Sequence, residues 1–123
     1  MSKTYRFTAA ALLYLIRIVN LWPAPNRAAL LAVARLGDKL DLTDEERETI
    51  GWKEVSQGGF EYQPDTVLSR ELTDEEAESL VRMVENPPER AAWTRATAPI
   101  MDAILRPLGR RGWLAEQKEQ KHG

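Results

Sequence analysis

The side chains in this sequence that could do chemistry are mainly carboxylates, and they recur in two copies of one short pattern. The segments LTDEERE (42–48) and LTDEEAE (72–78) begin 30 residues apart. Carboxylates grouped in this way can bind a divalent metal, exchange protons with a substrate, or attract a basic protein. A repeat architecture usually needs three or more copies. We therefore interpret the pair as two similar helix starts, with an ancestral duplication as the alternative.

Metal binding and catalysis gain little support from the surrounding residues. Asp74 and Glu78 share a predicted helix face, but the glycine-containing spacing of a calcium loop is absent. The chain has no cysteine, and its single histidine is His122, beside the C-terminus. The usual pairs of nucleophile and base cannot be built from this set. We predict a protein that is not an enzyme, without catalytic, cofactor-binding or metal-binding residues.

The acidic pattern belongs to a division of charge into blocks along the chain. Residues 1–37 contain five Lys or Arg and no acid, whereas residues 38–89 contain 16 acids and five bases. Residues 90–123 contain seven bases and three acids. Because surface potential follows such blocks, an acidic surface could dock on a basic protein and displace its nucleic acid. The predicted protein contacts are Asp44, Glu45, Glu48, Asp74, Glu75 and Glu78.

The basic ends of the chain support a second hypothesis, association with nucleic acid. Arginines neutralise phosphates, and an aromatic ring beside them suits stacking on single-stranded bases. In this alternative the protein is a regulator that uses its termini. The predicted contacts are Arg27, Arg35, Arg106, Arg110, Arg111 and Trp113.

Both acidic segments are expected to begin helices. Thr43 and Glu46 have the spacing of a capping box, and Thr73 and Glu76 repeat it. Acidic residues in a first turn also suit the positive end of the helix dipole. Two further helices are expected before them: an apolar, buried helix over about 8–20 and a second helix over about 26–40. A hairpin is expected around Gly58 and Gly59, with Phe60 and Tyr62 on one face, and a short strand over 67–72. The last expected helix covers about 89–105 and is interrupted or kinked at Pro99.

This order of elements predicts a mostly helical α+β fold with about five helices and one small β-hairpin. We expect one domain over residues 1–106 and an Arg-rich, flexible tail over residues 107–123. The order also fits a winged-helix-like core, with an unrelated small α+β fold as the alternative. The third helix offers carboxylates where DNA readout needs cations and amides, so duplex DNA is not its expected partner.

The run ALLYLIRIVNLWPAPNRAALLAVARLGDKLDLTDEERETIGWKEVSQGGFEYQ resembles a family of small phage-encoded proteins. The shared pattern covers about residues 10–85 and consists of two helices, an acidic helix start, a hairpin with an aromatic second strand, and a further helix. The Arg-rich segment after Arg106 departs from the short end of that family. No activity is assigned to the family, so the resemblance implies origin alone: a bacterial virus or prophage, and a bacterial cytoplasm.

The apolar stretch from Phe7 to Trp22 contains Arg17 and is shorter than the roughly 20 residues of a spanning helix. We expect no membrane association. The favoured hypothesis is a phage accessory protein that binds and inhibits a host or viral protein through an acidic surface. A third alternative is a small virion or assembly component, a homo-oligomer joined through its apolar first helix.

Overall fold

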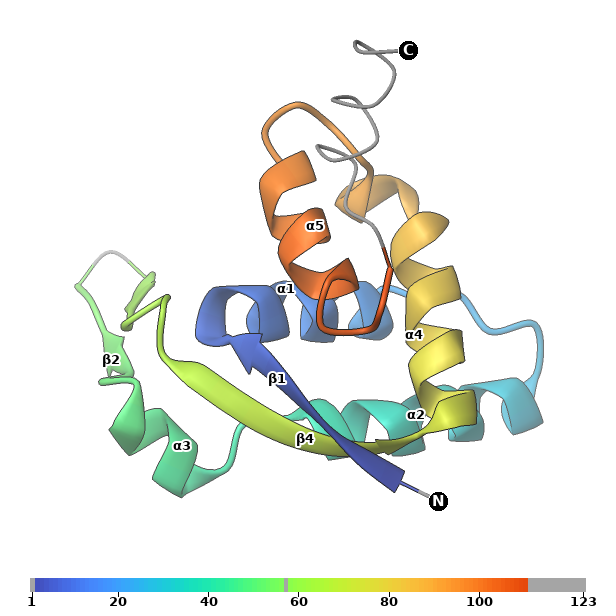
Figure 1. The fold of residues 1–123 in the computed structure, drawn as a ribbon. Helices are drawn as coiled ribbons and strands as arrows, with labels where there is room; N and C mark the ends of the chain where they lie inside the picture. Colours follow the sequence, from blue (N-terminus) through green and yellow to red (C-terminus); the bar gives the residue numbers. More distant parts are fainter. Residues whose placement is uncertain (1, 57, 111–123) are drawn as a thin grey trace, which may run out of the picture.

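The computed structural model describes residues 2–56 and 58–110, and it confirms the mostly helical α+β class (Figure 1). The predicted five helices and small hairpin are present, together with a further two-stranded sheet. The elements are β1 (Ser2–Thr8), α1 (Ala9–Asn20), α2 (Arg27–Leu40), α3 (Asp44–Thr49), β2 (Lys53–Glu54), β3 (Phe60–Glu61), β4 (Val67–Thr73), α4 (Asp74–Glu85), the 3₁₀ turn η1 (Glu89–Ala91) and α5 (Ala98–Leu105).

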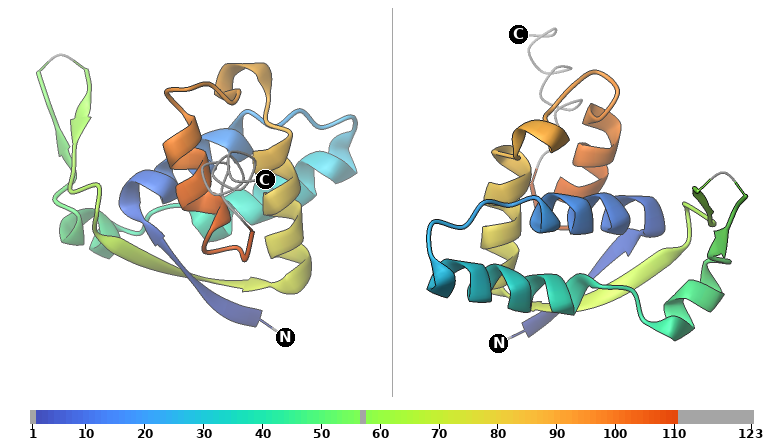
Figure 2. Two further views of the ribbon diagram at one scale, coloured as in Figure 1. Left: turned by 45° about the horizontal axis from the view of Figure 1, so that its top comes forward. Right: turned by 180° about the vertical axis from the view of Figure 1, so that it is seen from behind.

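Helix α1 lies at the centre of the molecule, as its apolar sequence predicted. Six of its residues are buried, and Leu12, Leu15 and Ile18 are fully enclosed. Helix α2 packs on one side of α1 and α5 on another (Figures 1 and 2). The Thr8 hydroxyl accepts a hydrogen bond from the Ala11 amide at 3.2 Å and so fixes where the helix begins. The apolar surface of α1 is therefore covered by other elements of the same chain.

A two-stranded antiparallel sheet of β1 and β4 crosses the body below α1 (Figure 1). Its register runs from Ser2 opposite Thr73 to Thr8 opposite Val67. Strand β4 was expected, but β1 was not. Only Phe7 in β1 is fully buried, so the strand lacks the run of alternating apolar residues that identifies strands in a sequence.

The fifth helix differs from its prediction. The segment 89–105 is not one kinked helix, because η1 is followed by an extended stretch and α5 begins only at Ala98. Pro99 lies in the first turn of α5, where its missing N–H leaves no hydrogen bond unmade. The indole N–H of Trp93 donates to the Val84 carbonyl at 2.7 Å and holds the stretch against the end of α4.

Helix α3 and the β2–β3 hairpin project from the body as an arm, which we define as residues 44–56 and 58–63 (Figures 1 and 2). No residue of α3 itself is buried, but Ile50, which caps its end, is fully buried in the core and anchors the arm. Helices of a winged-helix core instead bury their shared faces. The winged-helix alternative therefore fits the order of these elements but not the packing of α3.

Beyond α5 the described chain continues for a few residues past the predicted domain end at residue 106. Leu108 is buried in the core, and the Arg110 guanidinium pairs with the Glu78 carboxylate at 2.6 Å. The remainder of the predicted tail, residues 111–123, lies outside the described residues.

Candidate protein-binding surface

Both acidic segments begin helices with the predicted capping box. The Thr43 hydroxyl accepts from the Glu46 amide at 3.1 Å, and the Glu46 carboxylate accepts from the Thr43 amide at 3.0 Å. The matching distances for Thr73 and Glu76 are 3.1 and 2.8 Å. Glu46 and Glu76 are therefore structural residues, which satisfy backbone N–H groups at the helix starts.

A buried arginine on β4 joins the first acidic segment to the body. Arg70 is only 9% exposed and donates to both carboxylate oxygens of Glu46, at 2.5 and 2.7 Å. It also donates to the carbonyls of Leu40, Asp41 and Ser69 at 3.0, 3.1 and 2.7 Å. One guanidinium thus connects the end of α2, the start of α3 and β4. Sequence reasoning missed this role, although Arg70 stands at the inward position between Leu68 and Leu72.

These contacts determine the titration of Glu46. Partial burial raises its pKa. Hydrogen bonds from Arg70 and the Thr43 amide, together with the charge of Arg70, lower the pKa by more than burial raises it. The net result is a pKa below the ordinary value of 4.5. Glu76 behaves alike: burial raises its pKa, and bonds from Lys39 and the Thr73 amide with the charge of Lys39 lower it below 4.5.

The carboxylates of the second acidic segment are largely paired. Lys39 contacts Glu76 at 2.7 Å, Lys3 contacts Asp74 at 3.5 Å, and Arg110 contacts Glu78 at 2.6 Å. These cations come from α2, β1 and the chain after α5. The surface at the start of α4 is a shallow depression, and these three cations neutralise most of its negative charge. Its lining residues are Asp74, Glu75, Glu78, Ser79 and Arg82.

The carboxylates of the first acidic segment are arranged differently. Asp44, Glu45 and Glu48 are all exposed. Within residues 2–56 and 58–110, no ion pair of 4.0 Å or less involves any of the three. We call them the α3 triad. Their charge is uncompensated by close pairing and is directed to solvent.

The structure groups the six predicted contact residues into two separate sets. The α3 triad lies at the arm, whereas Asp74, Glu75 and Glu78 lie at the other end of β4 (Figures 1 and 2). The predicted single acidic surface is therefore two surfaces.

Three aromatic rings lie on the arm with the α3 triad. The ring of Trp52 stacks on Phe60 with centroids 4.6 Å apart and on Tyr62 at 5.7 Å. This confirms that Phe60 and Tyr62 share one face of the hairpin. Phe60 remains 52% exposed. Exposed aromatic faces attract Arg and Lys side chains, the same groups that carboxylates attract.

The residues predicted to contact nucleic acid are not brought together. Arg27 and Arg35 lie on α2, Arg106 and Arg110 follow α5, and these two helices pack on different sides of α1. Arg110 is also paired with Glu78. Arg111 and Trp113 lie outside the described residues. The described part of the chain therefore offers no continuous basic surface built from the predicted set.

Residues 2–56 and 58–110 contain neither a clustered metal site nor a membrane-spanning helix. Among them, no group of three or more His, Asp or Glu side chains is placed to hold a metal ion. No helix there is both long and apolar enough to cross a membrane. Comparisons with protein-family models, curated proteins and solved structures found no match to this chain. Inference of function therefore depends on the chemistry of the chain itself.

Proposed function

We propose that this chain is a non-enzymatic accessory protein of a bacterial virus or prophage that binds a basic face of another protein and inhibits it. The site of action would be the bacterial cytoplasm, and the target a host or viral protein. The observation that carries the proposal is the α3 triad, whose uncompensated carboxylates project on the same arm as the exposed ring of Phe60. The resemblance to small phage-encoded proteins supplies the origin.

The chemistry of the arm defines its partner. Over residues 44–63 the chain has six acids and two bases, a net charge of −4. Opposite charge speeds encounter and selects partners, so the target should present clustered Lys and Arg. Arginine suits this arm best, because its planar guanidinium can pair with a carboxylate and stack on an aromatic ring such as Phe60.

Inhibition follows from the kind of surface that the arm would cover. Proteins bind nucleic acids chiefly by placing Lys and Arg against phosphates. A carboxylate-bearing arm that occupies such cations competes directly with the phosphate backbone. The target would lose nucleic acid without any change to its active site.

The test is a pull-down from a nuclease-treated bacterial lysate with two matched variants. The arm variant replaces the α3 triad (Asp44→Asn, Glu45→Gln, Glu48→Gln), and the control variant makes the same kind of change at Asp74, Glu75 and Glu78. Both remove three charges and leave the capping boxes intact. We expect the arm variant to lose the specific partner at least tenfold, with the control close to wild type.

Two further outcomes decide the alternatives. Equal retention by both variants at unchanged helicity would contradict binding through the arm. Recovery of partners only without nuclease would favour the nucleic-acid hypothesis. A Phe60→Ala variant tests the aromatic part separately, and it should weaken binding while leaving the salt dependence unchanged.

A further inference from the structure

Helix α2 exposes an apolar surface that the body does not use. Residues 28–34 read AALLAVA, yet the buried residues of α2 are only Leu36, Gly37 and Leu40. Both Leu30, at 55%, and Leu31, at 48%, are exposed large apolar side chains. Because isolated apolar groups are common on surfaces but contiguous ones are not, this helix face is a candidate interface.

The exposed face has a definite order of charges. With about 100° between successive residues, five exposed residues lie within roughly 100° of arc. A cation stands at the start of the face, apolar side chains in the middle and a carboxylate at its end. We call this set the α2 strip: Arg27, Leu30, Leu31, Ala34 and Asp38.

The α2 strip is complementary to itself when one copy is reversed. If Arg27 of one copy faces Asp38 of another, the same pairing occurs again at the opposite end by symmetry. In that register Leu31 faces Ala34, a large apolar side chain against a small one. The two helix dipoles also run antiparallel, which favours the arrangement. Among the described residues, neither Arg27 nor Asp38 forms an ion pair within its own chain that would compete.

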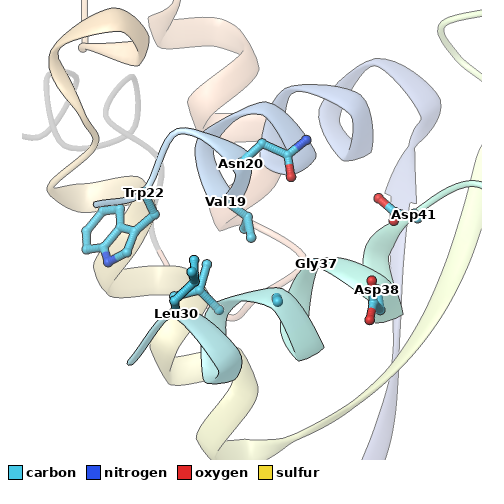
Figure 3. A pocket seen from close by; sticks show the side chains of 9 residues that line it. Val19, Asn20, Trp22, Leu30, Gly37, Asp38 and Asp41 are labelled. Carbon is cyan, nitrogen blue, oxygen red and sulfur yellow. The ribbon is translucent and has the colours of Figure 1, made fainter. Parts of the chain in front are cut away.

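A groove beside the α2 strip provides room for a partner side chain (Figure 3). It lies between the end of α1 and α2, with a volume of about 250 Å³. Trp22 and Leu30 both border it, and Val19 and Gly37 line its floor (Figure 3). Asn20, Asp38 and Asp41 also line the groove, so it combines an apolar floor with polar residues. Its apolar part, next to the exposed Leu pair, is suited to receive the equivalent Leu30 of a second copy.

We propose that this chain forms a two-fold symmetric dimer through antiparallel packing of its α2 strips. The expected partner is thus a second copy of this chain. One helix face is smaller than the roughly 800 Å² per partner of a standard interface. The dimer should therefore be weak and concentration-dependent, with a dissociation constant on the order of 10–100 µM. This inference concerns α2 and stands or falls separately from binding through the arm.

The test is sedimentation equilibrium of the whole chain from about 1 µM to 1 mM, a range that spans such a constant. Two variants reverse one charge each, Arg27→Asp and Asp38→Arg. Each should weaken self-association at least tenfold, because like charges then meet at both ends of the interface. A mixture of the two should form a heterodimer with both pairs restored. Arg95→Asp, on an exposed loop, is the matched control and should dimerise as wild type.

A Leu31→Asp variant tests the apolar centre and should be monomeric throughout the range. Its far-ultraviolet circular dichroism should match wild type, because Leu31 lies outside the core. A wild-type chain that stays monomeric to 1 mM would overturn the proposal. A dimer that survives Leu31→Asp, or single variants that fail to rescue each other, would overturn the antiparallel α2 interface.

Discussion

The two copies of the LTDEE pattern begin helices in the same way but serve different parts of the molecule. The first starts a six-residue helix without a buried residue, and the second starts a twelve-residue helix with five. In the first, Glu46 pairs with buried Arg70; in the second, Glu76 pairs with Lys39, whose side chain is 48% exposed. Local sequence thus sets the start of each helix, whereas distant partners decide whether its other carboxylates are paired.

Each copy also forms an ion pair with the element that precedes the other copy. Arg70 comes from the strand that precedes the second copy and binds Glu46 of the first. Lys39 comes from the helix that precedes the first copy and binds Glu76 of the second. The preceding elements are a strand in one case and a helix in the other. This difference favours two converged helix starts over a duplicated unit.

Removal of Arg70 should produce the largest difference between the copies. Arg70→Met removes a cation that is only 9% exposed and leaves Glu46 and the carbonyls of Leu40 and Asp41 without their donor. Removing one partner of a buried pair costs up to about 3–5 kcal/mol. Lys39→Met, the matched change at the second copy, should cost under about 1 kcal/mol because that pair is near the surface. Urea unfolding followed by circular dichroism measures both. Equal losses of unfolding free energy in the two variants would show that burial of the cation does not distinguish the two ion pairs.

Acidification should weaken both copies in the same direction. Glu46 and Glu76 have pKa values below 4.5 in the folded chain. Their stabilising contribution is present above the unfolded-state pKa and is lost as the pH falls through the lower folded-state value. The free energy of unfolding should therefore decrease below about pH 4.5. Glu46→Gln should make that decrease shallower, and an unchanged slope would contradict the assignment.

Loss of one N-cap hydroxyl should destabilise the protein less than loss of Arg70, and the affected region should differ between the two helices. Thr43→Ala and Thr73→Ala each remove a hydroxyl that accepts from a helix amide, a change that costs about 1 kcal/mol. Because α4 is packed into the core, Thr73→Ala should lower global stability. Thr43→Ala should act mainly on α3, as faster amide exchange there. Identical exchange maps for the two variants would be inconsistent with this comparison.

The smallest effect is expected at the exposed pair of Lys3 and Asp74. Their side chains are 68% and 70% exposed and 3.5 Å apart. Such pairs contribute about 0–1 kcal/mol, and less at high salt. Lys3→Ala should therefore change the urea midpoint only slightly. A large change would mean that β1 depends on this contact, not on its backbone pairing with β4.

Features that depend on short-range sequence could be predicted, whereas features that depend on distant residues could not. Capping boxes and the hairpin turn are short-range patterns, so α3, α4 and the stacking side of Phe60 could be predicted from the sequence. Strand β1 could not, since its pairing with β4 depends on residues far along the chain. The unpaired state of the α3 triad was likewise unpredictable, because pairing at Asp74 and Glu78 depends on Lys3 and Arg110. Pro99 predicts a kink only if the helix starts well before it; because α5 begins at Ala98, the proline lies in the first turn and causes none.

The arm leaves and rejoins the body at neighbouring points. It follows Asp41 at the end of α2 and returns through β4, and Arg70 of β4 donates to the carbonyls of both Leu40 and Asp41. The first part of the arm is fixed to the body, because Ile50 is fully buried and Glu46 pairs with Arg70. The hairpin beyond it has its two strands already paired, so the turn between them could be lengthened or exchanged at little entropic cost. The body and the start of the arm together are thus a scaffold for interchangeable hairpin turns. Selection could alter what the arm recognises, and an engineer could graft a new recognition loop, without redesigning the core.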